Sequence, residues 1–226
     1  DMNYAGGPFV ADLVSAPIDG SDNGFNASNV SIYFGGADNN AFDDLVITST
    51  VRPNINISGA TISSPVTFVG NNITVSALNA GGNNVNFDGA TVTPSGFGVD
   101  ITAGTLSFAG GSLGLAINGA TADSQYQQLN VSGGVNLTGV QLNLTGAFVP
   151  GAGNNFILVN NDGVDAVTGT FNGLPEGAIV NVNGVQRTIT YTGGTGNDVA
   201  LLAYPDAYYQ SVLSLGPVAY YRLNEA

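Results

Sequence analysis

The chain has 226 residues and a formal net charge of −13, with 16 acidic residues, three basic residues and no histidine, cysteine or tryptophan. Without imidazole or thiol groups, the sequence excludes disulfides and every metal centre or catalytic nucleophile that depends on those groups. Three cations cannot neutralise enough phosphates for a nucleic-acid partner. No apolar run approaches the roughly 20 residues of a membrane-spanning helix, so we expect no membrane insertion of this segment.

Short runs rich in Val, Ile, Thr, Leu and Phe predict β-strands along most of the chain. Residues 45–51, 66–69 and 188–192 are such runs, and Gly, Asn, Asp or Pro interrupts the pattern every few residues. With 43% hydrophobic and 8% charged residues, the chain is too apolar for disorder. No segment before residue 205 has helical periodicity, so the sequence predicts an all-β protein.

Residues 1–58 are expected to form an N-terminal β segment, which either contributes the first coils of the fold or serves as an interaction arm. Within it, residues 38–44 place three carboxylates and two amides after two glycines. Oxygen ligands of this kind suit calcium, so the candidate Ca²⁺ ligands are Asp38, Asn40, Asp43 and Asp44. The spacing does not match an EF-hand loop, and acidic residues are also common in turns. We expect that the protein requires no cofactor, and Ca²⁺ is the candidate for a bound ion.

Residues 59–145 contain an internal repeat. The tripeptide Gly-Ala-Thr recurs at residues 59, 89 and 119, and the sequence of residues 73–82 is echoed by that of residues 101–111. A unit of about 30 residues cannot bury its apolar face alone, so we expect such units to stack as the coils of a β-solenoid. A β-sandwich, which also has short strands and frequent turns, is the alternative.

Residues 146–203 depart from this repeat and are expected to form an atypical, hairpin-rich unit that caps the stack. Two strand-like runs, residues 178–182 and 187–191, flank the turn dipeptide Asn183-Gly184. Residues 193–198 match one copy of the calcium-binding nonapeptide of β-roll proteins. Because no tandem copy completes such a site, the segment is interpreted as a tight turn before a final strand at residues 199–203.

Four segments carry a resemblance to a known family: residues 126–131, 135–139, 171–177 and 189–199. With residues 101–106, their order and spacing are similar to the end of an array of autotransporter-associated β-strand repeats in large bacterial surface proteins. The resemblance covers roughly residues 99–203. It implies a right-handed β-solenoid (β-helix) and a bacterial extracellular or cell-surface location, with no catalytic residues.

Residues 204–226 are expected to form a C-terminal extension of a helix and a strand. Within it, residues 206–226 resemble the opening of a concanavalin-A-like, laminin-G-type lectin domain, through residues 208–213 and 216–225. A short helix is predicted after Pro205 and a strand at residues 218–223, whose main-chain groups must find a partner strand. This strand is expected to fold back on its own subunit or to add to the sheet edge of a neighbouring copy. The candidate interface residues are Tyr208, Tyr209, Val218, Tyr220, Tyr221 and Leu223.

The sequence favours a structural or adhesive surface protein, a subunit or segment that assembles with copies of itself into a filament or layer by β-edge pairing and solenoid stacking. The alternative is a carbohydrate-binding adhesin module, in which the Tyr-rich C-terminus contacts glycan. A β-helical polysaccharide-degrading enzyme is disfavoured, because the adjacent Asp43 and Asp44 on a strand would point to opposite faces. We therefore expect no enzymatic activity.

Overall fold

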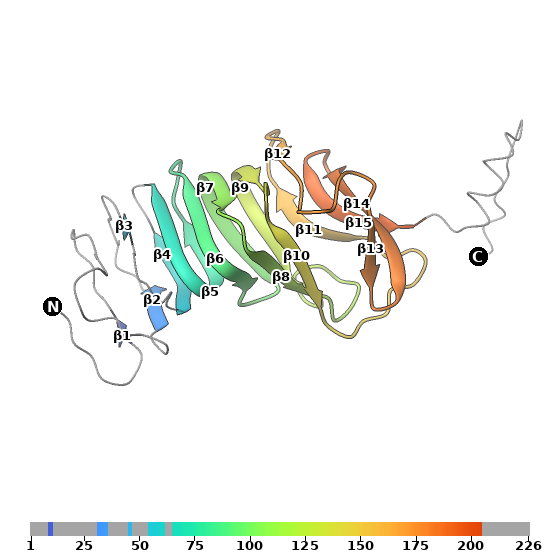
Figure 1. Ribbon diagram of the computed structural model, residues 1–226, viewed down its shortest axis with the longest axis horizontal. Helices are drawn as coiled ribbons and strands as arrows, with labels where there is room; N and C mark the ends of the chain where they lie inside the picture. The colour runs from blue at the N-terminus through green and yellow to red at the C-terminus, as the bar shows by residue number, and fades with distance from the viewer. Residues whose placement is uncertain (1–8, 11–30, 36–44, 47–53, 62–64, 205–226) are drawn as a thin grey trace, which may run out of the picture.

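The computed structural model describes residues 9–10, 31–35, 45–46, 54–61 and 65–204 (Figure 1). Their regular structure is entirely β, and fifteen strands join in one 15-stranded sheet that folds into a nearly closed, barrel-like body. The predicted all-β class is therefore confirmed. None of the described residues is helical, so this part of the chain has no helix that could cross a membrane. The helix and strand predicted for residues 205–226 lie outside the described residues.

The strands differ widely in length, from two residues to the fourteen of β5. In chain order they are β1 Phe9–Val10, β2 Ser31–Gly35, β3 Leu45–Val46, β4 Asn54–Thr61, β5 Val66–Asn79, β6 Val85–Pro94, β7 Gly98–Phe108, β8 Ser112–Ala116, β9 Gln128–Asn136, β10 Gln141–Thr145, β11 Phe156–Asn161, β12 Val167–Thr168, β13 Ile179–Val182, β14 Val185–Gly193 and β15 Asp198–Ala203.

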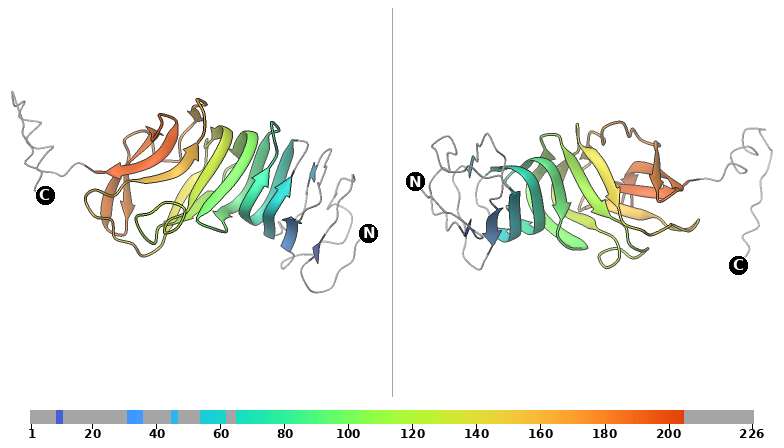
Figure 2. Two further views of the ribbon diagram at one scale, coloured as in Figure 1. Left: turned by 180° about the vertical axis from the view of Figure 1, so that it is seen from behind. Right: turned by 60° about the horizontal axis from the view of Figure 1, so that its bottom comes forward.

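Three parallel ladders run along the long axis of the body, and the chain passes through them in a constant order (Figures 1 and 2). The first ladder joins β3, the start of β5, the start of β6, the ends of β7 and β9, and β12. The second joins β1, β2, β4, the middle of β5, the end of β6, β8 and β10. The third joins the ends of β4 and β5, the starts of β7 and β9, and β11. Long strands such as β5 bend around a corner and serve more than one ladder.

Each ladder places a column of aliphatic side chains in the core, because alternate residues of a strand face the same side. Paired residues in these columns are at most 4% exposed. The columns are Val66, Val85, Leu106 and Val135 on the first ladder, Ile55, Ile73, Val92 and Leu113 on the second, and Leu78, Ile101 and Val131 on the third.

An aromatic column lies beside the aliphatic residues of the first ladder. Phe68, Phe87 and Phe108 follow one another, and the ring centroids of each neighbouring pair are 5.8 Å apart. Phe87 is fully buried between the other two rings, whereas Phe108 is 6% exposed. Burial of such rings and their tilted contacts stabilise the stacking of successive passes of the chain.

Gly133 allows β9 to lie close against β7. Its φ is +104°, and a Cβ atom at this position would collide with the main-chain carbonyl oxygen of Ala103. The pairing of β7 with β9 shifts register between Thr102 and Thr105, opposite this glycine. A residue with a side chain would therefore meet both a disfavoured backbone conformation and a steric clash.

The predicted 30-residue repeat does not correspond to equivalent structural positions. Ala60 pairs with Leu78 on the third ladder, whereas Thr91 pairs with Ser112 on the second. The third tripeptide, residues 119–121, lies in a loop outside the strands. Along the first ladder, paired residues are 19 positions apart between Val66 and Val85, but 29 apart between Leu106 and Val135. The recurring tripeptide therefore does not mark equivalent positions of the fold, while the ladders keep the apolar columns aligned through loops of different length.

Within residues 146–203, β11 and β12 pair in parallel with β9, and the strands that follow are antiparallel. β13 pairs with β14, β14 with β15, and β15 with β11. Asn183 and Gly184 form the β13–β14 turn with φ values of +48° and +87°, so both residues adopt the positive φ that a two-residue hairpin of this kind requires. The predicted hairpin across Asn183-Gly184 is confirmed.

Candidate functional site

The two sets of candidate site residues identified from the sequence lie outside the described residues. The candidate calcium ligands Asp38, Asn40, Asp43 and Asp44 fall in residues 36–44. The candidate interface residues Tyr208, Tyr209, Val218, Tyr220, Tyr221 and Leu223 fall in residues 205–226. Both sets remain predictions.

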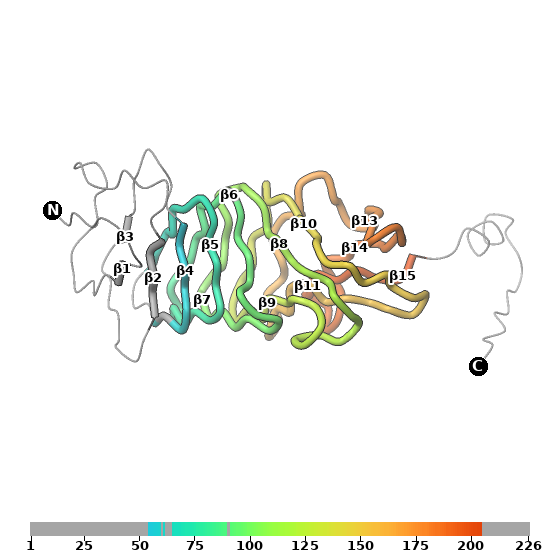
Figure 3. Tube along the Cα trace, turned by 90° about the horizontal axis from the view of Figure 1, so that it is seen from below, coloured from blue at the N-terminus to red at the C-terminus, as the bar shows by residue number. Residues whose placement is uncertain are grey.

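The three ladders end differently at the C-terminal end of the body. β15 pairs antiparallel with β11 and so covers the end of the third ladder. The second ladder ends at β10, which runs beside β8 (Figure 3). Within residues 65–204 and the shorter described segments before them, no strand pairs with the other edge of β10. The second ladder therefore ends in an open strand edge.

The side chains of β10 are less buried than those of β8. Leu113 and Leu115 of β8 are fully buried, with 0% exposure. Their partners in β10, Leu142 and Leu144, continue the same two columns but are only partly buried. A further strand on this edge would bury them as β10 buries the leucines of β8.

Main-chain hydrogen bonds identify the groups that face the open edge. The N–H of Gln141 donates to Gly111 O at 2.8 Å, and Thr145 O accepts from the N–H of Ile117 at 2.8 Å. Odd-numbered residues of β10 therefore direct their main-chain groups towards β8. Because these directions alternate along a parallel strand, the N–H and C=O groups of Leu142 and Leu144 face away from β8. Together they form a row of donors and acceptors at the edge, which we call the β10 edge.

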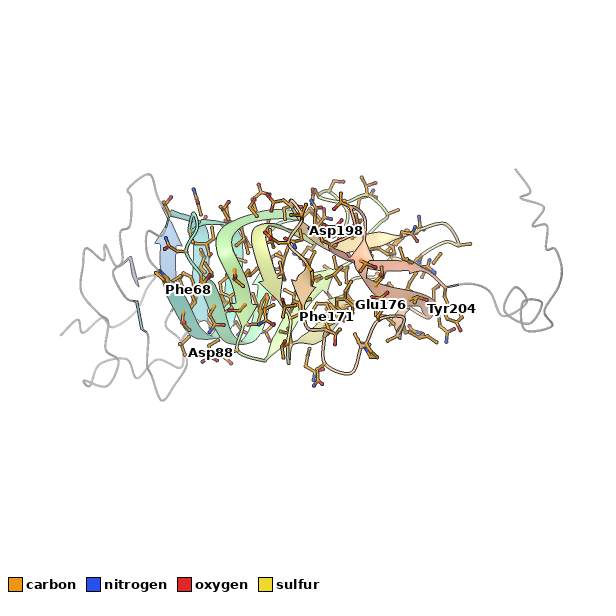
Figure 4. All side chains as sticks on the ribbon, turned by 90° about the horizontal axis from the view of Figure 1, so that it is seen from above. Phe68, Asp88, Phe171, Glu176, Asp198 and Tyr204 are labelled. Atoms are coloured by element: carbon orange, nitrogen blue, oxygen red, sulfur yellow. The ribbon has the colours of Figure 1, made fainter. Side chains whose placement is uncertain are left out.

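A buried polar cluster closes the third ladder. Asn161 follows the core residues Ile101 and Val131 in that ladder and is 1% exposed. Its main-chain N–H donates to Asp198 Oδ1 at 2.8 Å, and Asp198 Oδ2 accepts from the N–H of Thr195 at 2.9 Å. Asp198 is itself 1% exposed and lies at the start of β15 (Figure 4). The carboxyl group thus ties the final strand to β11.

Asn197 fixes the loop between β11 and β12. Its Nδ2 lies 3.2 Å from Asp162 O, 3.3 Å from Gly163 O and 3.2 Å from Asp165 O. Its Oδ1 accepts from Thr195 Oγ1 at 2.7 Å, which fixes the orientation of the amide. The point on which the three carbonyls converge is therefore occupied by an amide nitrogen.

The segment similar to a calcium-binding nonapeptide is thus a tight turn, as predicted, and β15 begins at its last residue, Asp198. Among the described residues, no group of three or more Asp or Glu side chains is placed to hold a metal ion. A cation bound by the three loop carbonyls would first have to displace the amide of Asn197.

A ladder of polar side chains follows the outer face of the third ladder. Asn130 Nδ2 donates to Asp100 Oδ1 at 3.0 Å, and Asn160 Nδ2 donates to Asn130 Oδ1 at 3.1 Å. Asp100 and Asn160 are exposed, and Asn130 is half-buried. These side chains hydrogen-bond one another in register with the main-chain ladder beneath them.

Arg187 holds the loop after β10 against the hairpin. It is 2% exposed, and its Nη2 donates to Gly151 O at 2.6 Å while its Nη1 donates to Gln186 O at 3.0 Å. Its Nε has no hydrogen-bond partner in the described part of the chain. Burial lowers the pKa of this guanidinium group from its ordinary value.

Two buried tyrosines anchor other segments with their hydroxyl groups. Tyr191 Oη accepts from the N–H of Phe171 at 2.9 Å and donates to Leu174 O at 2.7 Å. Tyr126 Oη accepts from the N–H of Ile157 at 3.2 Å. Burial raises the pKa of both phenols, and Glu176 adds a smaller upward contribution at Tyr191. The two hydroxyl groups thus fix the main chain at residues 171–174 and at Ile157.

Comparison of the chain with models of known families gives no match, and comparisons with curated proteins and with solved structures give none.

Sequence reasoning did not identify the β10 edge, the closing role of Asn197 or the buried Arg187. One signal was present: Asn161 interrupts a column that is otherwise aliphatic, which marks the end of the third ladder. Residues 140–145, however, have the same alternating pattern as the covered strands. Nothing local distinguishes them as an edge.

Proposed function

We propose that this chain is a structural subunit, or a segment, of an extracellular filament or surface layer that assembles through β-edge pairing. In this proposal the three parallel ladders are the faces of a right-handed β-solenoid, with residues 146–203 as its end unit. The bacterial surface location rests on the resemblance to autotransporter-associated repeats. The proposed partner is another copy of the chain.

The observation that carries the proposal is the β10 edge. It combines main-chain groups that pair with no described strand and two leucines that are buried less than their counterparts in β8. Main-chain donors and acceptors at a sheet edge form a template for another strand, and apolar side chains at the same edge gain burial when a strand is added. The β10 edge therefore supports the proposal that this protein pairs its sheet with a strand of a partner molecule.

The composition supports the same proposal. A chain with 8% charged residues and 33 glycines presents little bulky, strongly hydrated surface to a neighbouring copy. The net charge of −13 would oppose association at low ionic strength. Ca²⁺ bound at Asp38, Asn40, Asp43 and Asp44 would reduce that repulsion, and this site is part of the proposal.

The test is the concentration dependence of assembly, measured by light scattering after size-exclusion chromatography and by negative-stain electron microscopy. We expect ordered oligomers or fibres for the wild-type chain and their loss in Leu144→Lys, because the lysine places a charge at the half-buried edge. Asn143→Lys is the matched control, since it adds the same charge to an exposed position of the same strand. A wild-type chain that stays monomeric at every concentration, or a Leu144→Lys variant that assembles normally, would contradict the proposal.

A further inference from the structure

At the C-terminal ends of the three ladders, two strands have an outer edge that pairs with no described strand: the five-residue β10 and the two-residue β12. β15 already occupies the outer edge of β11, and Asn172 N–H donates to Val140 O at 2.7 Å just before β10 begins. The β10 edge is a strand of five residues, Gln141–Thr145. A complete further circuit of chain would meet β15 at the third ladder, whereas a single strand would not. The edge thus fits one extended segment of about five or six residues.

We infer that the segment that adds to the β10 edge is residues 218–223 of a second copy of this chain. This inference rests on the proposed function and names its donor strand. The segment has six residues, Val-Ala-Tyr-Tyr-Arg-Leu, and follows β15 in sequence. It matches the length of the edge.

The side-chain pattern of the segment fits the edge as well. In an extended strand, Ala219, Tyr221 and Leu223 share one face, while Val218, Tyr220 and Arg222 share the other. The first face is entirely apolar or aromatic and continues the columns that reach Leu142 and Leu144. The opposite face carries the charged Arg222, which stays on the outer side together with the exposed Asn143.

The length of chain between the body and the donor segment allows exchange between copies. Fourteen positions separate Tyr204, the last described residue, from Val218. An extended chain spans at most about 3.3–3.6 Å per residue, so this connection reaches on the order of 45–50 Å. When two copies exchange an identical segment, the interface between them reuses contacts that the segment could make within its own copy.

Cysteine cross-linking tests the inference directly, because the chain contains no cysteine of its own. One preparation carries Asn143→Cys, and the other carries Tyr220→Cys or Arg222→Cys, which covers neighbouring registers on the outer face. After mixing and mild oxidation, we expect a covalent dimer on a non-reducing gel. The control is Asn56→Cys, because Asn56 is also exposed on the outer side of the second ladder but lies several strands before β10. It should give no dimer above background.

A second measurement uses matched charges in the donor segment. Tyr221→Lys places a charge on the face that meets Leu142 and Leu144, and we expect at least a tenfold loss of cross-linked dimer in the Asn143→Cys reaction. Tyr220→Lys, measured against Arg222→Cys, puts the same charge on the outer face and should retain most of the dimer. Equal losses for the two lysine variants would overturn the inference.

The outcomes separate this inference from the proposed function. If Leu144→Lys abolishes assembly but Tyr221→Lys assembles normally, β-edge assembly stands and residues 218–223 are not the donor. If a double variant, Asn143→Cys with Tyr220→Cys in one chain, forms an internal disulfide at high dilution and no dimer, the segment covers its own edge and exchange between copies is wrong. If the wild-type chain is monomeric and no cross-link forms, both proposals fail.

Discussion

The substitution Asn197→Asp tests whether the amide of Asn197 closes the end of the third ladder. The new side chain has the same size, but it replaces an N–H₂ donor with a carboxylate oxygen. Three carbonyl oxygens, those of Asp162, Gly163 and Asp165, then face an acceptor where they had faced a donor at 3.2–3.3 Å. The site is 6% exposed, so water gives little compensation.

The magnitude follows from the lost bonds and the buried charge. The amide has two N–H groups, and each hydrogen bond contributes about 1 kcal/mol net, which gives a loss of about 2 kcal/mol. An uncompensated buried charge raises the total to about 3–5 kcal/mol at neutral pH. In acid the new carboxyl group is protonated and can donate one hydrogen bond, so the cost falls to about 1–2 kcal/mol.

The measurement is equilibrium unfolding in urea at about pH 4 and about pH 8, followed by far-ultraviolet circular dichroism and tyrosine fluorescence. The quantity of interest is the difference in free energy of unfolding between variant and wild type at each pH, so other titrating groups largely cancel. Asn160→Asp is the control. Asn160 is exposed and donates one hydrogen bond, to Asn130, so we expect a change within about 0.5–1 kcal/mol at both pH values.

Two results would refute this reasoning. A cost for Asn197→Asp that is no larger than that for Asn160→Asp would show that the loop carbonyls do not depend on the amide. A large cost that does not change between acid and neutral pH would show that the buried charge is not its source.

Three further predictions concern the body of the fold. Phe87→Ala should cost about 3–5 kcal/mol in urea unfolding and Phe108→Ala clearly less, because Phe87 is fully buried between two rings; equal costs would contradict the column. Gly133→Ala should lower the midpoint of thermal unfolding much more than Gly139→Ala, because both glycines have positive φ but only at Gly133 would the added Cβ atom clash with a neighbouring strand. Similar midpoints for the two variants would argue against the close approach of β9 to β7. Burial raises the pKa of Tyr191, so its contribution to the free energy of unfolding should be fully present below the unfolded tyrosine pKa of 10.0 and should decrease as the pH rises above that value. Tyr191→Phe should therefore reduce the loss of stability at alkaline pH in pH-dependent urea titrations, and an unchanged loss would exclude Tyr191 as its cause.

Features set by neighbouring residues could be predicted from the sequence. Asn and Gly are among the residues that adopt positive φ at little energetic cost, so the dipeptide Asn183-Gly184 predicts the hairpin between β13 and β14. The alternation of apolar and polar residues likewise indicated strands at residues 66–69 and 188–192, which lie in β5 and β14.

Features set by distant pairing could not be predicted. Val85 pairs with Leu106, 21 positions later, and Leu106 pairs with Val135, 29 positions later. The number of residues between paired positions therefore changes along the first ladder, while the apolar column continues. A repeat search that assumes one period cannot find such a pattern. The role of Asn197 also depends on a loop more than 30 residues earlier, and only the fold brings the two together.

The lengthening of successive circuits has a consequence for any larger structure built from this chain. The number of residues between ladder partners increases from 19 between Val66 and Val85 to 29 between Leu106 and Val135, so the loops between ladder positions lengthen along the body. If copies stack in a row along this axis, as proposed, the row has a direction. Growth, breakage and attachment to a support would then differ between its leading and trailing tips.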